Sequence, residues 1–109
     1  MSEAVLADPI LARLKKELEA LYGARLKRVL LYGSRARGDH RPDSDFDVLV
    51  VLNGPIDYWP ETQHLGALSG SIGIETAGRA IFSLRPVTEE QIQERTGFMH
   101  NVRKEMVEF

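Results

Sequence analysis

The sequence predicts an α/β or α+β fold, in which a small mixed sheet is flanked by helices. Helix and strand patterns alternate in the order helix, strand, loop, strand, helix, strand, helix, helix, which is typical of this class. Two aliphatic runs enclose a loop that is rich in glycine, arginine and aspartate. At 109 residues the chain has the length of one ordinary domain, and we expect residues 1–109 to form a single one.

The first helix is expected between Asp8 and Gly23. Asp8 can accept hydrogen bonds from free backbone N–H groups, while Pro9 lacks an N–H group and has a φ angle that suits a helix. Gly23 is a suitable C-terminal cap. Apolar residues recur between them at helical spacing and form one face: Ile10, Leu14, Leu18 and Leu21.

Three segments have the character of strands. Lys27–Tyr32 is a short aliphatic run that ends at Gly33, and Phe46–Leu52 is rich in β-branched residues. The third segment is Arg79–Val87, and its Pro86 has no backbone N–H to donate, so we expect this strand to end at an edge of the sheet. Its side chains should alternate between two faces, with Ala80, Phe82 and Leu84 on one and Ile81 and Ser83 on the other.

Three further helices are predicted in the second half of the chain. The longest covers Tyr58–Thr76, where apolar residues recur at roughly helical spacing although each of three glycines disfavours a helix by about 1 kcal/mol. Thr88–Gln91 matches a capping box and begins a short helix. A last helix is expected after Gly97, where apolar residues lie four apart: Phe98, Val102 and Met106.

The composition narrows the classes of function. A formal net charge of -2 argues against a protein that binds long nucleic acid mainly by neutralising phosphates, because such domains are usually basic. No apolar run is long enough to cross a bilayer, MSEAVLADPI lacks the pattern of a secretion signal, and cysteine is absent, so we expect a cytoplasmic protein without disulfides. Positive charge is nonetheless concentrated in residues 24–41, where Asp39 is the one acid among Arg25, Lys27, Arg28, Arg35, Arg37 and Arg41.

Asp45 and Asp47 lie two positions apart at the start of the second strand. Alternate residues of a strand leave the same face, so both carboxylates are expected together, with Cα atoms about 6.5 to 7 Å apart. Phe46 and Val48 would then point into the core. Two carboxylates this close need a cation, and hard oxygen ligands suit Mg²⁺ or Mn²⁺. We therefore predict a metal site at Asp45 and Asp47.

Gly33 and Ser34 directly follow the first strand. Arg35, Ala36 and Arg37 can form the first turn of a short helix, whose free N–H groups attract anions. Glycine lets the backbone approach a ligand, and the Ser34 hydroxyl can donate to a phosphate oxygen. Arg35 or Arg37 can add charge-assisted hydrogen bonds. We predict that this segment binds phosphate, and that the phosphates meet the metals if the two strands are neighbours.

These residues resemble a known motif. Gly33-Ser34, ten residues and then Asp45-Phe46-Asp47 are similar to the G-S-x10-D-x-D motif of the polymerase-β nucleotidyltransferase superfamily. The longer pattern GSRARGDxxxxSDxDxxV resembles the minimal nucleotidyltransferase branch of that superfamily, and the likeness is specific from Val29 to Val51. A looser similarity extends over most of the chain, including the ending FMHNVRKEMVEF, which resembles the family's closing helix.

The resemblance implies a polymerase-β-like nucleotidyltransferase fold and a Mg²⁺-dependent reaction. A nucleoside monophosphate, with AMP from ATP as the leading candidate, would pass from an NTP to an acceptor hydroxyl with loss of pyrophosphate. Gly33 and Ser34 are assigned to the triphosphate, and Asp45 and Asp47 to metal. Several family members are encoded beside a helical HEPN protein as a toxin–antitoxin pair and adenylylate a tyrosine of that partner. A partner of this type is expected here, and the oligomeric state, a homo-oligomer included, stays open.

One departure from the family pattern leaves two functions open. Family catalysts usually supply a third carboxylate from a later strand, but no acid lies between Glu75 and Glu89, and the strand positions expected to face the site are Ile81 and Ser83. Glu75 is the one nearby candidate for a third metal ligand. The chain is therefore either a nucleotidyltransferase that modifies a partner protein, or a catalytically weak or inactive nucleotide-binding module that neutralises a partner by contact.

Overall fold

The computed structural model contains one four-stranded sheet with the strand order β3-β2-β1-β4. The central strands β1 (Leu26–Tyr32) and β2 (Phe46–Leu52) are antiparallel neighbours. At one edge β3 (Phe82–Val87) runs parallel to β2, and at the other edge β4 (Val107–Glu108) runs antiparallel to β1. The prediction of a mixed sheet flanked by helices is confirmed.

The structure describes residue 5 and residues 7–109. The predicted absence of a secretion signal depends largely on residues 1–4 and 6, which lie outside the described residues. The helices that are described have these bounds: α2 Pro9–Tyr22, the 3₁₀ turn η1 Gly23–Arg25, α3 Ser34–Arg37, α4 Tyr58–Glu75, α5 Glu89–Ile92 and α6 Gly97–Glu105.

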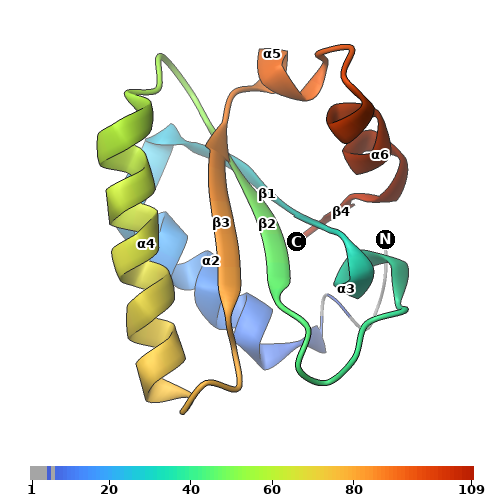
Figure 1. The fold of residues 1–109 in the computed structure, drawn as a ribbon. Coiled ribbons are helices and arrows are strands. Elements are labelled where there is room, and N and C mark those ends of the chain that lie inside the picture. The colour runs from blue at the N-terminus through green and yellow to red at the C-terminus, as the bar shows by residue number, and fades with distance from the viewer. Residues whose placement is uncertain (1–4, 6) are drawn as a thin grey trace.

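Helices pack on both faces of the sheet, and the core accordingly has two parts. In Figure 1, α2 passes behind the strands and α4 runs along β3. Helix α5 lies at the top of the view, and α6 lies at the right. The larger part joins α2, α4 and one face of the sheet, with fully buried side chains that include Leu14, Val50 and Leu65. The smaller part joins α5, α6 and the other face, where Leu49 and Ile92 are buried. No described helix lies in front of the amino-terminal end of β2 in this view.

Local signals fix most of the helix ends where they were expected. The Asp8 carboxylate accepts a hydrogen bond from the Ile10 N–H at 2.9 Å, and Gly23 follows α2 with a φ of 56°. Thr88 and Gln91 form a reciprocal capping box, with bonds of 2.9 and 3.2 Å. The long helix α4 forms in spite of its three glycines because the burial of apolar side chains such as Leu65 outweighs their weak helix propensity.

The third strand confirms its predicted place at an edge but begins later than expected. Of the described strands, β2 alone pairs with β3, so the N–H that Pro86 lacks leaves no gap in the ladder. The strand begins at Phe82 and not at Arg79, because the chain is still turning there: the Gly78 N–H donates to the Gly73 carbonyl at 2.8 Å, and Arg79 donates to Thr76 at 3.1 Å.

The end of the chain differs from the prediction. The likeness of FMHNVRKEMVEF to a closing helix, with Met106 on its apolar face, predicted helix throughout, but α6 ends at Glu105 and Val107–Glu108 form β4. The Phe109 N–H donates to the Val29 carbonyl at 3.1 Å, and the Phe109 side chain is buried in the larger core. The edge of β1 and this apolar pocket therefore outweigh the helical spacing of the last residues.

Candidate functional site

The two halves of the predicted site meet at the contact between Gly33 and Asp47. Tyr32, the last residue of β1, lies opposite Asp47 in the antiparallel ladder, and Gly33 follows it. Gly33 has a φ of 80°, and a Cβ atom added there would lie 2.5 Å from Oδ2 of Asp47. An L side chain is disfavoured by this φ and would also strike the carboxylate. The backbone of Gly33 and the Asp47 carboxylate of β2 therefore lie directly against each other.

The turn after Gly33 presents backbone N–H groups at this position. The Gly33 carbonyl accepts hydrogen bonds from Ala36 and Arg37, both at 3.1 Å, which closes the first turn of α3. In the part of the chain that the structure describes, the N–H groups of Ser34 and Arg35 have no hydrogen-bond partner. These N–H groups and the half-buried Ser34 hydroxyl are suited to an anion.

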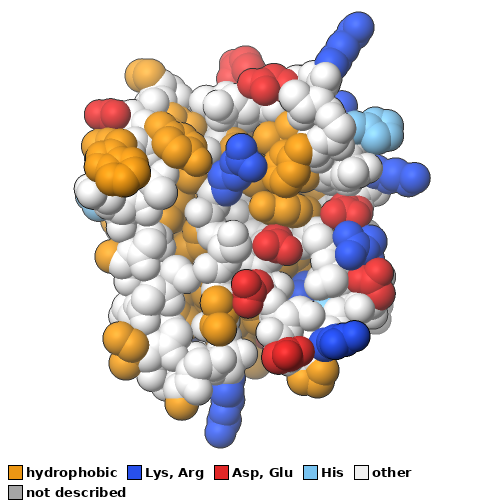
Figure 2. Space-filling model, viewed as in Figure 1, with side chains coloured by type: hydrophobic (Ala, Val, Ile, Leu, Met, Phe, Trp, Pro, Cys, Tyr) orange, Lys and Arg blue, Asp and Glu red, His pale blue; other side chains and the backbone are white. Residues whose placement is uncertain are grey.

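Asp45 and Asp47 interact electrostatically, as their spacing predicted. The pKa of Asp47 is raised, first because the residue is half-buried and then because Asp45 repels its charged form; Arg37 acts in the opposite direction and Glu105 adds to the rise. Figure 2 shows acidic side chains gathered near the centre of this face, beside basic and apolar ones. Burial and the neighbouring carboxylate therefore disfavour the charged form of Asp47, and a bound cation would favour it.

This donor set fits Mg²⁺ or Mn²⁺ that is shared with a ligand. Two carboxylates provide hard oxygen donors, and no cluster of three acidic or histidine side chains suited to a metal is present within residue 5 and residues 7–109. Mg²⁺ commonly takes one or two protein carboxylates and completes its shell with phosphate oxygens and water. Asp45 and Asp47 would hold such an ion only together with a phosphate ligand.

Glu75 does not join this pair in the structure. It is the last residue of α4, and its carboxylate forms an ion pair with the Arg13 guanidinium of α2. Both side chains are partly exposed. The structure therefore gives Glu75 a place in the contact between two helices, and its predicted role as a third ligand finds no geometric support.

Arg35 braces the loop before β2. Its guanidinium donates to the Ser44 carbonyl at 2.9 and 3.1 Å and to the Pro42 carbonyl at 3.2 Å, and it lies 4.1 Å from the centre of the Phe46 ring. The planar face of the Arg35 guanidinium thus stacks on the Phe46 ring, while its N–H groups donate to the two carbonyls. Arg35 thus fixes the loop at Pro42 and Ser44, just before Asp45. The sequence suggested that its guanidinium binds phosphate, but in the structure it donates to these loop carbonyls.

Arg37 lies at the site and contacts a residue that the sequence analysis missed. Its Nη1 donates to Oε2 of Glu105 at 3.0 Å, and its Nε donates to Asp39 at 3.1 Å. The other oxygen of Glu105 accepts a hydrogen bond from the Gly33 N–H at 3.0 Å. Glu105 is the last residue of α6, so the third acid near Asp47 comes from a helix at the end of the chain. An acid in the last turn of the closing helix was its one signal in the sequence.

The rim of the site on β3 carries no acid. Ser83 lies opposite Asp47 in the parallel ladder, as its predicted face required, and Ile81 is half exposed beside it. Further along the strand, the Arg85 guanidinium lies 4.8 Å from the centre of the Phe98 ring. The rings of Phe98 and Tyr32 pack edge to face, with their centres 5.7 Å apart. The pKa of Tyr32 is raised, first by burial and then by the negative charge of Asp47. A serine therefore lies opposite Asp47 on β3, and the absence of an acid on this strand agrees with the sequence.

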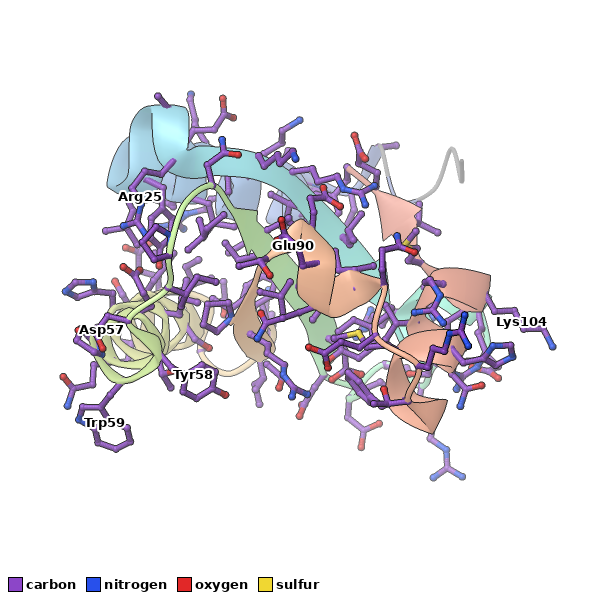
Figure 3. All side chains as sticks on the ribbon, turned by 90° about the horizontal axis from the view of Figure 1, so that it is seen from above. Arg25, Asp57, Tyr58, Trp59, Glu90 and Lys104 are labelled. Atoms are coloured by element: carbon purple, nitrogen blue, oxygen red, sulfur yellow. The ribbon has the colours of Figure 1, made fainter. Side chains whose placement is uncertain are left out.

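Aromatic surface is also exposed away from these acids. Tyr58 and Trp59 point outward from the start of α4 (Figure 3), and their exposed fractions are 54% and 68%. Lys104 of α6 points away on the other side of the molecule in the same view.

None of the described helices is both long and apolar enough for a membrane crossing.

The family follows from a match to a known domain. A family model described as a nucleotidyltransferase domain matches residues 11–98. The chain belongs to this family. The matched range of the nucleotidyltransferase domain contains the Gly33-Ser34 turn and both aspartates, whereas Glu105 lies beyond it.

Two curated proteins of Methanocaldococcus jannaschii resemble part of this nucleotidyltransferase domain. Provisionally named protein adenylyltransferases MJ0604 and MJ0141, they are 44% identical over 41 residues and 42% identical over 43 residues. These segments cover 38% and 39% of this chain. The chain spans only 41% and 43% of the two relatives, about two fifths of each.

Solved structures share the fold of the nucleotidyltransferase domain. A provisionally named nucleotidyltransferase from Sulfolobus solfataricus has a TM-score of 0.62 at 22% identity, over 92% of this chain and 76% of its own. A toxin–antitoxin structure named MntA-HpeT has a TM-score of 0.60 at 14% identity, and a toxin–antitoxin structure with AMP-PNP has 0.53 at 17%. Each of these two covers 88% of this chain and 69% of its own. At these identities the likeness concerns the fold.

Proposed function

We propose that this chain is a Mg²⁺-dependent nucleotidyltransferase that moves AMP from ATP to a hydroxyl group of a partner protein. The contact between Gly33 and Asp47 carries this proposal, because Asp47 of β2 lies against the turn that we predict to bind phosphate. Family membership supports the reaction type. With a net charge of -2, the chain is a poor match for a long nucleic acid as acceptor.

In the proposed reaction, the acceptor oxygen forms a bond to the α-phosphorus of ATP, and the bond from that phosphorus to the oxygen bridging to the β-phosphorus breaks. Pyrophosphate leaves with the electron pair of that bond, and the hydroxyl proton passes to solvent. A bound Mg²⁺ would polarise the α-phosphate and stabilise the leaving oxygens. Asp45 and Asp47 would hold that ion, while the Ser34 N–H and hydroxyl bind the phosphate chain.

The nucleotide and the acceptor are proposed from the relatives. Protein adenylylation appears in the names of the two curated proteins, and AMP-PNP, an ATP analogue, appears in the name of one structure with the same fold. Two structures of this fold are of toxin–antitoxin complexes. We therefore propose a HEPN-type helical protein as the acceptor, with this chain as the antitoxin of the pair. Tyr58 and Trp59 offer exposed aromatic surface for such a contact.

The test is transfer of label from ATP. The protein is incubated with α-³²P-labelled ATP, Mg²⁺ and the product of the neighbouring gene, and labelled protein is separated by electrophoresis. We expect label on the partner that disappears with Asp45→Ala and stays with Asp43→Ala, an exposed acid of the same loop. Absence of label on the partner, or equal labelling by the Asp45 variant, would reject the proposal.

A second function, neutralisation of the partner by contact alone, also has a specific observation in its favour. Ser83 stands opposite Asp47, and no third acid completes a metal cluster among the residues described. Catalysis could then be too slow to matter, although positioning and charge supply most of the acceleration in phosphoryl transfer. If a variant lacking both Asp45 and Asp47 carboxylates still neutralises the partner, contact is sufficient; measurable pyrophosphate release by the wild type favours the enzyme.

A further inference from the structure

Glu105 connects the end of α6 to the turn that is proposed to bind phosphate. Its Oε1 accepts a hydrogen bond from the Gly33 N–H at 3.0 Å, and its Oε2 accepts one from Arg37 at 3.0 Å. Gly33 and Arg37 precede Glu105 by 72 and 68 positions in the chain. The Glu105 side chain is 20% exposed, and both of its carboxylate oxygens accept hydrogen bonds.

The two bonds act on the parts of the turn whose geometry matters most. Gly33 has a φ of 80° and lies against the Asp47 carboxylate, a conformation that glycine tolerates but does not prefer over its alternatives. A charge-assisted bond to its N–H fixes the orientation of the peptide that joins β1 to the turn. The second bond fixes the Arg37 guanidinium at the end of α3, on the other side of Ser34.

We propose that Glu105 is a positioning residue of the nucleotide site, which holds the Gly33 peptide and Arg37 so that the Ser34 N–H and hydroxyl face the phosphates beside Asp47. This inference rests on the proposed function, because it assigns Glu105 to the same site. Glu105 acts through Gly33 and Arg37, because both of its carboxylate oxygens accept hydrogen bonds from them. The active geometry of the turn thus depends on a helix outside the segment that carries the motif.

An opposite role for the same contacts is testable. A phosphate would accept hydrogen bonds from the same two donors, the Gly33 N–H and the Arg37 guanidinium. In this second role, Glu105 competes with the nucleotide for them. Removal of a competitor would tighten nucleotide binding, whereas removal of a positioning residue weakens it. The sign of the change in affinity separates the two roles.

Three variants make the test specific. Glu105→Met keeps the length of the side chain but removes both acceptors, and Glu105→Gln keeps an acceptor for the Gly33 N–H while losing the charge. Glu108→Ala is the matched control, because it removes another acid of the same end of the chain, one that pairs with Arg28 away from Gly33. Glu105→Ala replaces the Met variant if that variant does not fold.

The measurements are calorimetric titration with Mg²⁺ and a non-hydrolysable ATP analogue, and hydrogen exchange of the Gly33 amide by NMR. With Glu105→Met we expect the dissociation constant to rise by about tenfold or more and Gly33 exchange to accelerate by a similar factor. With Glu105→Gln most of the protection of Gly33 and part of the affinity should return. Glu108→Ala should match the wild type in both measurements.

Two results would overturn the positioning role. If the wild type binds the analogue and Glu105→Met binds it equally well or more tightly, Glu105 does not position the site. If Glu105→Gln is as impaired as Glu105→Met in both measurements, the bond to the Gly33 N–H is not what acts. A wild type that binds no Mg²⁺-nucleotide rejects the proposed function itself, and this inference with it.

Discussion

Gly33 and Asp47 occupy adjoining positions so closely that a single added carbon at Gly33 would come within 2.5 Å of the Asp47 carboxylate. The contact arises because β1 and β2 are antiparallel neighbours, with Tyr32 opposite Asp47 in the ladder. It places a turn whose Ser34 and Arg35 N–H groups have no partner among the described residues next to Asp47, an acid whose pKa is raised by burial and by Asp45. A ligand that contains both phosphate and cation satisfies both at once.

Gly33→Ala should abolish Mg²⁺-nucleotide binding. The new methyl group displaces Asp47, and the positive φ adds strain of about 1–2 kcal/mol. Gly38→Ala is a suitable control, because Gly38 has a φ of 86° but nothing lies within 4 Å of an added Cβ. We expect both variants to lose stability in urea denaturation and only Gly33→Ala to lose binding. Equal binding by the two variants would show that the contact with Asp47 is unimportant.

Asp47→Asn should stabilise the metal-free protein at neutral pH while removing nucleotide binding. The pKa of Asp47 in the folded protein is raised, first by burial and then by Asp45, above its ordinary value of 3.8. Ionisation therefore costs stability: the cost grows as the pH rises from the ordinary pKa to the raised one, and it stays constant above that. We therefore expect a small gain in the free energy of unfolding and in Tm at neutral pH.

The pH dependence of this gain checks its cause. Asp47 becomes protonated in acid, so the advantage of Asp47→Asn should shrink as the pH falls from about 7 toward 4. The measurement is chemical denaturation of both proteins in EDTA at several pH values. Asp43→Asn, in the exposed part of the same loop, should show no such gain. An Asp47 variant that is less stable at pH 7 than at pH 4, relative to the wild type, would contradict the account.

Arg35→Ala should loosen the loop that leads into Asp45. The variant loses the hydrogen bonds to the Ser44 and Pro42 carbonyls and the stacking on Phe46, at a cost of about 2 kcal/mol. Limited proteolysis should detect faster cleavage within residues 38–45. Arg41→Ala, an exposed arginine of the loop itself, should cleave like the wild type. Unchanged stability and cleavage of Arg35→Ala would mean that the loop keeps its form without the brace.

Phe109→Ala should destabilise the fold by about 3 kcal/mol, because it empties a buried aromatic site beside β1. Leu21→Ala is a control of similar chemistry, since Leu21 is 44% exposed and should cost much less. The measurement is urea denaturation followed by circular dichroism. If the two variants lose the same small amount, Phe109 is not anchored in the core and the β4 pairing lacks its main support.

The elements that the sequence predicted well are those with local signals. Helix caps depend on residues that are close in the sequence. Asp8 and Pro9 begin α2, and Thr88 begins α5 through its capping box, so both helix starts can be predicted without knowledge of the tertiary fold. The strand Phe46–Leu52 was predicted with its observed bounds because its composition is uniform. The likeness to the nucleotidyltransferase motif also depends on a continuous segment.

The features that were missed depend on pairs far apart in the chain. β4 is only two residues long and forms because the edge of β1 is available, which no local pattern indicates. Glu105 reaches Gly33 across 72 residues. Positive charge is concentrated in residues 24–41 of the sequence, yet Arg25 pairs with Glu61 and Arg28 with Glu89. Much of that positive charge therefore stabilises the fold.

The most direct test of the account is the affinity of the protein for a non-hydrolysable ATP analogue, measured by calorimetry with and without Mg²⁺. The account predicts that Mg²⁺ tightens binding by about tenfold or more in the wild type, and that Asp45→Asn abolishes this gain. Binding that is indifferent to Mg²⁺, or a gain that survives in Asp45→Asn, would contradict the claim that the Gly33-Ser34 turn and the two aspartates form one site.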